Sequence, residues 1–503
     1  MKRFSLTLSI LLLGIITIIA GNNKNLPTIC PEPIRCYISD DYFPLKKITI
    51  ACEDKKAVDW ARRHLREWYG RFSPTSESAK AKTSDMGEEA YELSIAKEVK
   101  VKAKTIKGVR HALYSLRQLA IPRRGTLKVE GWIVPKAEIE DEPDMKFRGI
   151  HICWFHENTP QEIERFIRLA AYYKLNYAVI ESWGTFRSES APWLGWQDGT
   201  MTKQEIKRLK AIADDLGITL IPQMNFFGHA TMARHCAGKH ATLDLNPDYQ
   251  PLFEPFAGWN WCLSNPETLK LQQSLIGELH EAFGNPPYFH IGCDEANYPS
   301  CPECTKQPYS ELFVGHIKEI NKTLSKRGAR PMMWHDMLLD NKDSRWIGFY
   351  ANGDSELVKA VKDLPRNIIV CDWYYGDRKE SYPTLDYFKQ SGFDVLTCPW
   401  DNVGGIIAQG KYAHSHGING ILGTLWHHHT GNTMADIFFN LANIAWNSNS
   451  SMKVNSPEGG NSNSKDYLVH THLRQMAWDM NITDSRLTGV YKDEIPTASA
   501  PNN

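Results

Sequence analysis

The sequence lacks an excess of charge of either sign, because 58 Lys and Arg residues balance 58 Asp and Glu residues along its 503 positions. Proteins that bind nucleic acid or an anionic membrane usually carry a basic surface, so we expect neither as the main partner. Hydrophobic residues make up 42% and charged residues 23%, which predicts a packed core and argues against global disorder. This balance fits a neutral substrate.

Long hydrophobic runs are also scarce. One apolar run, Leu6 to Ala20, follows the basic start Met1-Lys-Arg3. The run is shorter than the about 20 residues of a membrane-spanning helix, and small residues close it, which predicts a signal peptide over residues 1–21. We therefore expect an exported chain, either periplasmic, cell-surface or extracellular, with no membrane span.

Motifs for nucleotides and metals are weak or missing. The sequence has no P-loop and no G-x-G-x-x-G opening a helix after a strand, so no cofactor is expected. Cys301 and Cys304 form a C-x-x-C, for which we expect a local disulfide in an oxidising compartment. Zinc would need two further ligands, and none lies at a matching spacing. Consecutive strand residues point to opposite faces, so the run His427–His429 does not predict a metal site either.

The first part of the chain has the pattern of a small α/β domain, which we assign to residues 22–140. Helical spacing of apolar residues covers 55–72 and 108–119. Strand-like segments lie at 45–52, 90–95, 98–105 and 126–134.

From residue 145 to 447 strands and amphipathic helices alternate, which predicts a (β/α)8 TIM barrel after the small α/β domain. The predicted helices cover 160–174, 202–216, 266–283 and 309–327. Residues 448–503 read as an Asn- and Ser-rich loop, a possible packing helix and a disordered tail. The eight predicted strands are 147–153, 176–182, 218–225, 288–294, 330–336, 367–374, 393–400 and 419–426.

Active groups of such barrels lie at the carboxyl ends of the strands, and there the sequence places aromatic and polar residues together. Flat sugar faces pack on indole rings, so this composition predicts a pocket for a neutral sugar. Among the residues at these strand ends, the candidate substrate-binding residues are Arg148, His229, Trp334, Trp373, Tyr375, Trp400, Asp401, Trp426 and His428.

The strongest candidates for catalysis are Asp294 and Glu295, which end the apolar segment Tyr288-Phe-His-Ile-Gly-Cys-Asp-Glu295. Two adjacent carboxylates repel, so one of them is expected to keep its proton to higher pH and to serve as a general acid. A retaining glycosidase usually places two carboxylates on opposite sides of the sugar. Two residues that are adjacent on one loop do not easily reach both sides. An acetamido group on the substrate can supply the missing nucleophile.

Several segments resemble family 20 glycoside hydrolases, the β-N-acetylhexosaminidases. The segment His290-Ile-Gly-Cys-Asp-Glu295 matches the H-x-G-x-D-E signature of that family. Three more segments resemble the family in the same order along the chain: 108–119, 139–149 and 221–230. The resemblance covers about 120–450 and implies an exo-acting, retaining removal of terminal β-linked N-acetylhexosamine (GlcNAc or GalNAc) from a glycan.

The resemblance also implies roles for individual residues. Glu295 would act as general acid and then base, while Asp294 would orient the acetamido group to form an oxazolinium intermediate. Arg148 would bind sugar hydroxyls, and His229 would support the pocket. The walls around the acetamido group and the ring would be Trp334, Trp373 and Trp426.

The chain departs from the family pattern at its last two strands. The seventh strand ends in Pro399-Trp-Asp-Asn-Val403 without the Tyr that grips the acetamido carbonyl, and Tyr375 is the expected replacement. The eighth strand ends in Trp426-His-His428 and lacks the acid that binds sugar hydroxyls. These losses motivate one alternative, a catalytically lapsed barrel that acts as a secreted carbohydrate-binding protein. A second alternative is a barrel hydrolase with another substrate, such as a metal-assisted one.

Overall fold

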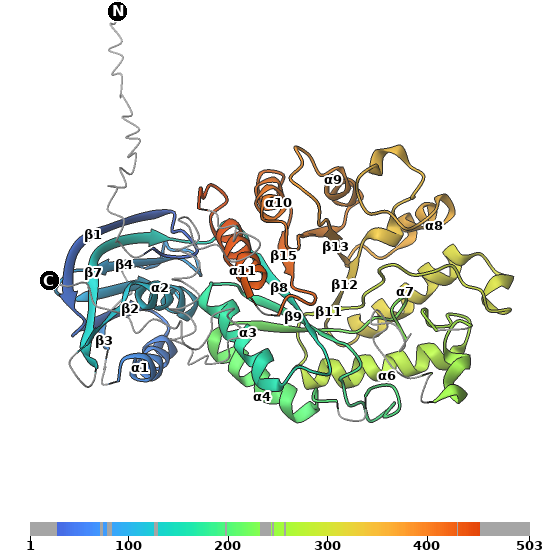
Figure 1. The fold of residues 1–503 in the computed structure, drawn as a ribbon, viewed down its shortest axis with the longest axis horizontal. Helices are drawn as coiled ribbons and strands as arrows, with labels where there is room; N and C mark the ends of the chain where they lie inside the picture. The colour runs from blue at the N-terminus through green and yellow to red at the C-terminus, as the bar shows by residue number, and fades with distance from the viewer. Residues whose placement is uncertain are drawn as a thin grey trace, which may run out of the picture.

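The computed structural model describes residues 28–70, 74–77, 83–124, 129–196, 199–231, 243, 246–255, 258–429 and 431–452. Figure 1 shows two parts: an N-terminal α/β domain in blue, and a barrel surrounded by helices that runs from green to red. The predicted signal peptide and most of the segment 448–503 lie outside the described residues.

The N-terminal domain is a sheet of seven strands in the order β1-β7-β4-β5-β2-β3, with β6 paired to β7. Two helices, α1 (Lys55–Tyr69) and α2 (Ile106–Leu119), pack on it and share one apolar core. The strand predicted at 126–134 begins later and runs to Asp141, and Arg35–Pro44 is a strand that the sequence pattern did not predict. The strands are β1 (Arg35–Pro44), β2 (Ile48–Cys52), β3 (Thr75–Glu77), β4 (Tyr91–Ile95), β5 (Val99–Ala103), β6 (Ile121–Arg124) and β7 (Val129–Asp141).

The predicted TIM barrel is confirmed, because eight parallel strands close in the order β10-β11-β12-β13-β14-β15-β8-β9. Each strand overlaps the range predicted for it. The strands are β8 (Phe147–Trp154), β9 (Tyr177–Ser182), β10 (Thr219–Gln223), β11 (Tyr288–His290), β12 (Arg330–Trp334), β13 (Ile369–Trp373), β14 (Asp394–Cys398) and β15 (Gly420–Thr424).

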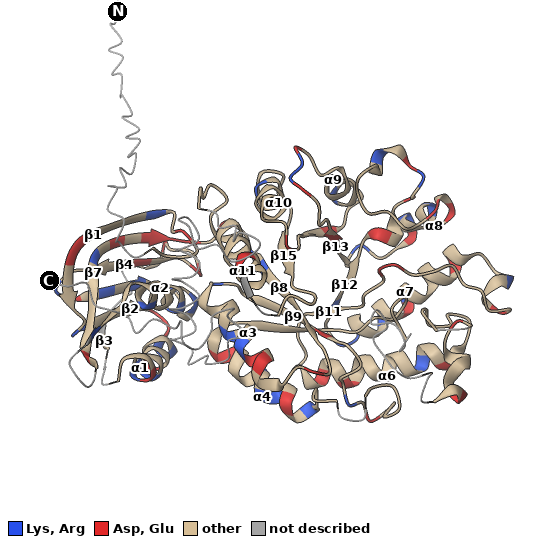
Figure 2. Ribbon diagram, in the orientation of Figure 1, with Lys and Arg blue, Asp and Glu red and all other residues tan. Residues whose placement is uncertain are grey.

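Helices cover the outside of the barrel, and their starts follow from local sequence. Thr159 forms a reciprocal capping box with Glu162 at the start of α3, and Asn265 caps α6 ahead of Pro266. Figure 2 shows acidic and basic residues mixed along α3, α4 and α6, as the balanced composition suggests. The long helices are α3 (Pro160–Tyr172), α4 (Lys203–Leu216), α6 (Pro266–Ala282), α7 (Tyr309–Ser325), α10 (Val403–Ser415) and α11 (Gly431–Trp446), with α8 (Ser355–Ala360) and α9 (Pro383–Gln390) between them.

The two domains share a buried polar contact. Asp141, the last residue of β7, accepts hydrogen bonds from Trp446 Nε1 at 2.8 Å and from Tyr91 Oη at 2.7 Å. The fully buried Lys174 ammonium lies 3.3 Å from the same carboxylate. Because a buried charge is costly unless it is paired, this cluster fixes the barrel against the first domain.

Among the residues that the structure describes, none of the helices combines the length and the hydropathy needed to cross a membrane.

Candidate active site

The chain leaves β11 through a turn that places the two acidic residues at the barrel mouth. Gly292 has φ +73° and a Cβ at this position would meet Asn225 Cγ at 2.5 Å, so no larger residue fits. Cys293 and Glu295 also adopt positive φ, at 80° and 47°. Such strained backbone persists only where the surrounding structure holds it, and it is concentrated at functional sites.

The adjacent acids lie in different environments. The Asp294 side chain is 9% exposed and accepts a hydrogen bond at 3.0 Å from Asn225 Nδ2. The Glu295 side chain is 51% exposed. One carboxylate is therefore held in place inside the pocket wall, while the other faces solvent at its entrance.

His229 connects the two acids. Its Nε2 lies 3.4 Å from Asp294 Oδ2 and 3.2 Å from Glu295 Oε2. The ring packs at 4.2 Å on Trp259, whose Nε1 donates to the Glu295 carbonyl at 2.8 Å. His229 also has a positive φ of 58°, so its position is set by these contacts.

A third carboxylate lies behind the pair. Asp336 is fully buried and accepts hydrogen bonds from the Glu295 backbone N–H at 2.9 Å and from Trp373 Nε1 at 3.2 Å. Burial, together with the nearby charge of Asp294, raises the pKa of Asp336 to about 7. Asp336 thus fixes the backbone of the exposed acid and the ring of a wall residue at once.

The predicted aromatic residues come together around the acids. Trp426 Nε1 donates to Tyr375 Oη at 2.9 Å, and Trp426 lies 6.0 Å from Trp334 between ring centroids. Tyr375 contacts Trp373 at 5.0 Å and Trp400 at 5.2 Å. The structure thereby assembles one continuous wall from the ends of β12, β13, β14 and β15.

Asp401 and His428 lie at the edge of this wall. His428 Nε2 is 3.3 Å from Asp401 Oδ2, and its ring packs on Trp400 at 5.2 Å. Burial lowers the pKa of His428, and the neighbouring His427 lowers it further. Two polar side chains, from the ends of β14 and β15, therefore lie together at the edge of the aromatic wall.

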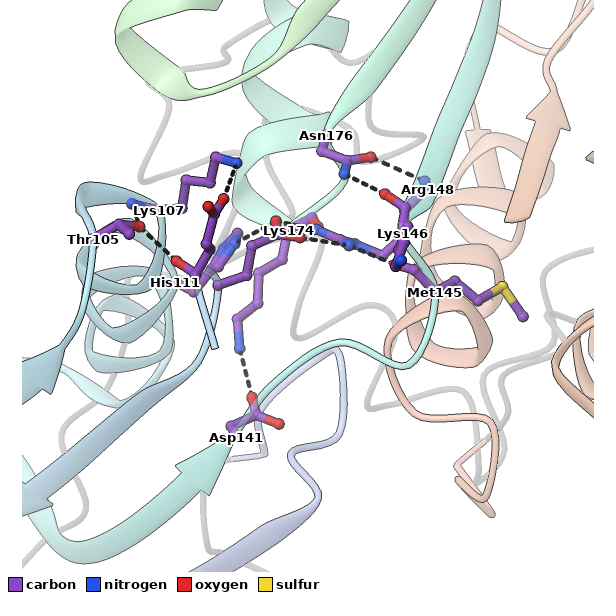
Figure 3. Close-up of polar contacts among 11 residues, drawn as sticks. Thr105, Lys107, His111, Asp141, Met145, Lys146, Arg148, Lys174 and Asn176 are labelled. Atoms are coloured by element: carbon purple, nitrogen blue, oxygen red, sulfur yellow. Dashed lines mark hydrogen bonds and ion pairs between the residues drawn. The ribbon is translucent and has the colours of Figure 1, made fainter. Parts of the chain in front are cut away.

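The structure does not support the sugar-binding role expected for Arg148. Arg148 is the second residue of β8, at the opposite end of the strand from the acids, and its side chain is fully buried. Its guanidinium donates to Glu89 Oε1 at 2.7 Å. It also donates to the Met145 carbonyl at 2.7 Å and to the Lys174 carbonyl at 3.1 Å (Figure 3). All of these contacts lie at the domain interface, so Arg148 cannot touch a sugar at Glu295.

Sequence reasoning gave no role to Asp336, Asn225, Trp259 and Tyr350. Asp336 is the last residue of the predicted strand 330–336, and its place at a strand end was an available signal. Tyr350 stacks on Trp373 at 4.0 Å from a loop with no regular pattern, and Trp259 reaches Glu295 from a similar loop. No periodicity predicts such contacts.

The disulfide expected between Cys301 and Cys304 is not formed, because both are free thiols in the structure.

Two curated proteins show what the sequence is similar to. Beta-hexosaminidase of Vibrio furnissii is 25% identical over 340 residues, which cover 59% of this chain and 54% of that protein. Lacto-N-biosidase of Bifidobacterium bifidum is 24% identical over 320 residues, covering 59% of this chain and 25% of the relative. The chain thus spans between a quarter and about half of the length of these two curated relatives.

Solved structures share the fold at low identity. A β-N-acetylhexosaminidase from Bacteroides fragilis superposes with a TM-score of 0.66 and 18% identity, covering 90% of this chain and 96% of that one. An exo β-N-acetylglucosaminidase from Vibrio harveyi, solved in complex with N-acetylglucosamine, superposes with a TM-score of 0.64 and 19% identity. The match covers 90% of this chain and 77% of that one.

Two family models match the chain directly. The catalytic domain of glycosyl hydrolase family 20 matches residues 177–448, more than half of the chain, and domain 2 of the same family matches residues 26–142. The chain belongs to glycosyl hydrolase family 20.

Proposed function

We propose that the chain is an exo-acting, retaining hydrolase that removes terminal β-linked N-acetylhexosamine, either GlcNAc or GalNAc, from a glycan. The observation that carries this proposal is the pair on one turn: a buried, oriented Asp294 beside an exposed Glu295. Neighbours on a single turn do not flank an anomeric carbon from both sides, as an acid and a carboxylate nucleophile would. The nucleophile must then come from elsewhere, and the substrate acetamido oxygen can provide it.

The proposed steps use the two acids differently. Glu295 donates its proton to the glycosidic oxygen as the acetamido carbonyl oxygen bonds to the anomeric carbon, and the leaving alcohol departs. Asp294 accepts a hydrogen bond from the acetamido N–H and stabilises the positive charge of the oxazolinium ring. Glu295 then removes a proton from water, which opens the ring with retention of configuration.

The aromatic wall suits the substrate group that this mechanism requires. Trp334, Trp373 and Trp426 can enclose an acetamido methyl and one face of the sugar ring. We propose Tyr375, held by Trp426 Nε1, as the donor to the acetamido carbonyl. Asp401 and His428 would then contact sugar hydroxyls at the edge of the wall.

The test is a panel of aryl β-glycosides: the N-acetylglucosaminide, the N-acetylgalactosaminide and the glucoside that lacks the acetamido group. We expect turnover of at least one N-acetylated substrate and at least about 10³-fold less of the glucoside, because the nucleophile is then missing. A thiazoline analogue of the cyclic intermediate should inhibit far more tightly than the substrate binds. Comparable turnover of the glucoside contradicts the proposal.

The carbohydrate-binding alternative rests on the missing family residues of β14 and β15. It predicts that an immobilised N-acetylhexosamine retains the chain while no aryl glycoside of the panel is hydrolysed.

Export is also part of our proposal, on the basis of the apolar run from Leu6 to Ala20. Expression with its own N-terminus and sequencing of the mature start would test it.

A further inference from the structure

Three cysteines and a glutamate that are far apart in the sequence meet beside the active site. Cys262, Cys301, Cys304 and Glu254 are all buried, and one ligand atom of each lies within 4.8 Å of every other. Cys262 Sγ is 3.7 Å from Cys301 Sγ and 3.7 Å from Cys304 Sγ. A disulfide has an S–S bond of about 2.05 Å, whereas sulfurs bound to one tetrahedral zinc at about 2.3 Å lie roughly 3.8 Å apart. The observed Sγ–Sγ distances match sulfurs bound to one zinc ion and not a disulfide bond.

The glutamate supplies a second, independent observation. Glu254 is 6% exposed, and its Oε1 has no hydrogen-bond partner among the described residues. Its other oxygen, Oε2, accepts from the backbone N–H groups of Ser300 at 2.7 Å and Cys301 at 2.8 Å. A buried carboxylate oxygen without a donor is costly, and a cation would satisfy it.

The surroundings also resemble those of metal ligands. The Cys304 N–H donates to Cys301 Sγ at 3.2 Å, which would stabilise a thiolate at that sulfur. A cation bound here would displace the thiol protons.

We propose that Cys262, Cys301, Cys304 and Glu254 bind one structural zinc ion in tetrahedral geometry. Binding releases the three thiol protons to solvent and forms three Zn–S bonds and one Zn–O bond. All four positions of the ion are filled by the protein, so the site is closed to substrate and has no catalytic role.

The proposed ion would connect the two loops that shape the entrance of the active site. Glu254 and Cys262 flank Trp259, whose Nε1 donates to the Glu295 carbonyl. Cys301 and Cys304 lie on the loop that follows Glu295. Between them, Asn260 Oδ1 accepts from the Asn297 N–H at 3.1 Å. Zinc would therefore hold the general acid in position from outside the pocket.

The experiment measures metal in the full chain, purified with a mild reductant and without chelators. We expect about one zinc per chain by elemental mass spectrometry in the wild type. Cys304→Ser and Glu254→Gln should contain several-fold less zinc. Cys52→Ser is the matched control, because Cys52 is a partly buried thiol of the N-terminal domain that donates to the Lys104 carbonyl, far from the proposed site in the sequence. This variant should keep the full zinc content.

A second measurement uses the wild-type chain, so it gives a result even if the variants fail to fold. Wild-type chain grown with cobalt should show the charge-transfer and ligand-field bands of tetrahedral cobalt with thiolate ligands. The proposal is overturned if the wild type carries no stoichiometric metal and non-reducing peptide mapping finds a disulfide among these cysteines. It is also overturned if Cys304→Ser keeps its zinc. Neither result bears on glycoside turnover, so this test is independent of the proposed function.

Discussion

At the scale of single residues, the two adjacent acids are distinguished by their surroundings rather than by their chemistry. Asp294 is fixed by Asn225, whereas Glu295 is exposed and is fixed through its backbone and through His229. The pocket thus holds one carboxylate still and leaves the other open to the leaving group. This difference predicts different consequences of neutralising each acid.

Glu295→Gln should lower kcat by about 10²–10⁴-fold on a natural disaccharide, because proton donation to the leaving oxygen is lost. The loss should be smaller on an aryl glycoside with an acidic leaving group, which needs little protonation. Steady-state kinetics on both substrates would check this.

Asp294→Asn should lower kcat by about 10²-fold or more on both kinds of substrate, because it weakens stabilisation of the cyclic cation whatever the leaving group. Equal losses across a series of aryl leaving groups would agree with this role. Wild-type turnover of Asp294→Asn would refute it.

Asp336 gives a prediction about pH. A carboxyl with a folded pKa of about 7 binds its proton more tightly than in the unfolded chain, where its pKa is about 4. The folded state therefore loses stability as pH rises from about 4 to about 7, and Asp336→Asn removes that loss. We expect the melting temperature of the variant, relative to wild type, to rise between about pH 5 and about pH 8, by the equivalent of about 2–3 kcal/mol.

The melting temperatures at low pH serve as the reference in this experiment. Asp336→Asn also disturbs the hydrogen bond from the Glu295 N–H, so the variant has a constant stability penalty at low pH. Only the change with pH reports the titration. A difference in melting temperature that stays flat over this range would show that Asp336 titrates normally.

At the scale of elements, the turn after β11 depends on a glycine. In Gly292→Ala a Cβ at φ +73° would meet Asn225 Cγ at 2.5 Å, and Asn225 is the residue that orients Asp294. We expect a loss of about 1–3 kcal/mol in stability and at least about tenfold in kcat, measured by denaturant unfolding and kinetics. Gly315→Ala is the control, since α7 leaves open space there, and it should gain about 0.5–1 kcal/mol.

Elements also show how far the sequence allows prediction. Alternating apolar runs located all eight barrel strands and the helices α3, α4, α6 and α7, because burial imposes strong periodicity on both. The strand predicted at 288–294 ends at His290, since the turn with Gly292, Cys293 and Glu295 at positive φ is not visible in hydrophobicity.

In the candidate site, the sequence predicted some residues and missed or misplaced others. Asp294, Glu295 and the aromatic wall follow from the rule that strand ends converge at the barrel mouth. Arg148 was misplaced because a residue at the start of a strand was treated like one at its end. Glu254 and Cys262 were missed because no local pattern indicates that they lie beside Cys301, 39 residues after Cys262.

At the scale of the whole molecule, the pair Arg148–Glu89 joins the two domains. Burial alone would raise the pKa of Glu89, but the hydrogen bond from His111 and the charge of Arg148 hold it well below its ordinary value. A depressed pKa stabilises the fold above the unfolded pKa of about 4.3, and this contribution is lost as pH falls below it.

We therefore expect Glu89→Gln to cost about 3 kcal/mol at neutral pH, because Arg148 is left buried without its counterion. The difference from wild type should shrink as the pH is lowered toward about 3. Glu140→Gln breaks an exposed pair with Arg35 and should cost at most about 1 kcal/mol. KM should be unchanged in Glu89→Gln, and a large rise in KM would restore a substrate role for Arg148.

Trp446 connects the end of the barrel to the beginning of the chain. Its indole is part of the apolar core of the N-terminal domain, and it donates to Asp141, which lies 305 residues earlier. During synthesis the first domain leaves the ribosome long before this side chain exists, with Asp141 and Lys174 still lacking their cover. The first domain therefore cannot reach its final packing until the last barrel helix has been translated. A nascent chain halted before α11 would remain exposed to proteases and chaperones at its amino-terminal half.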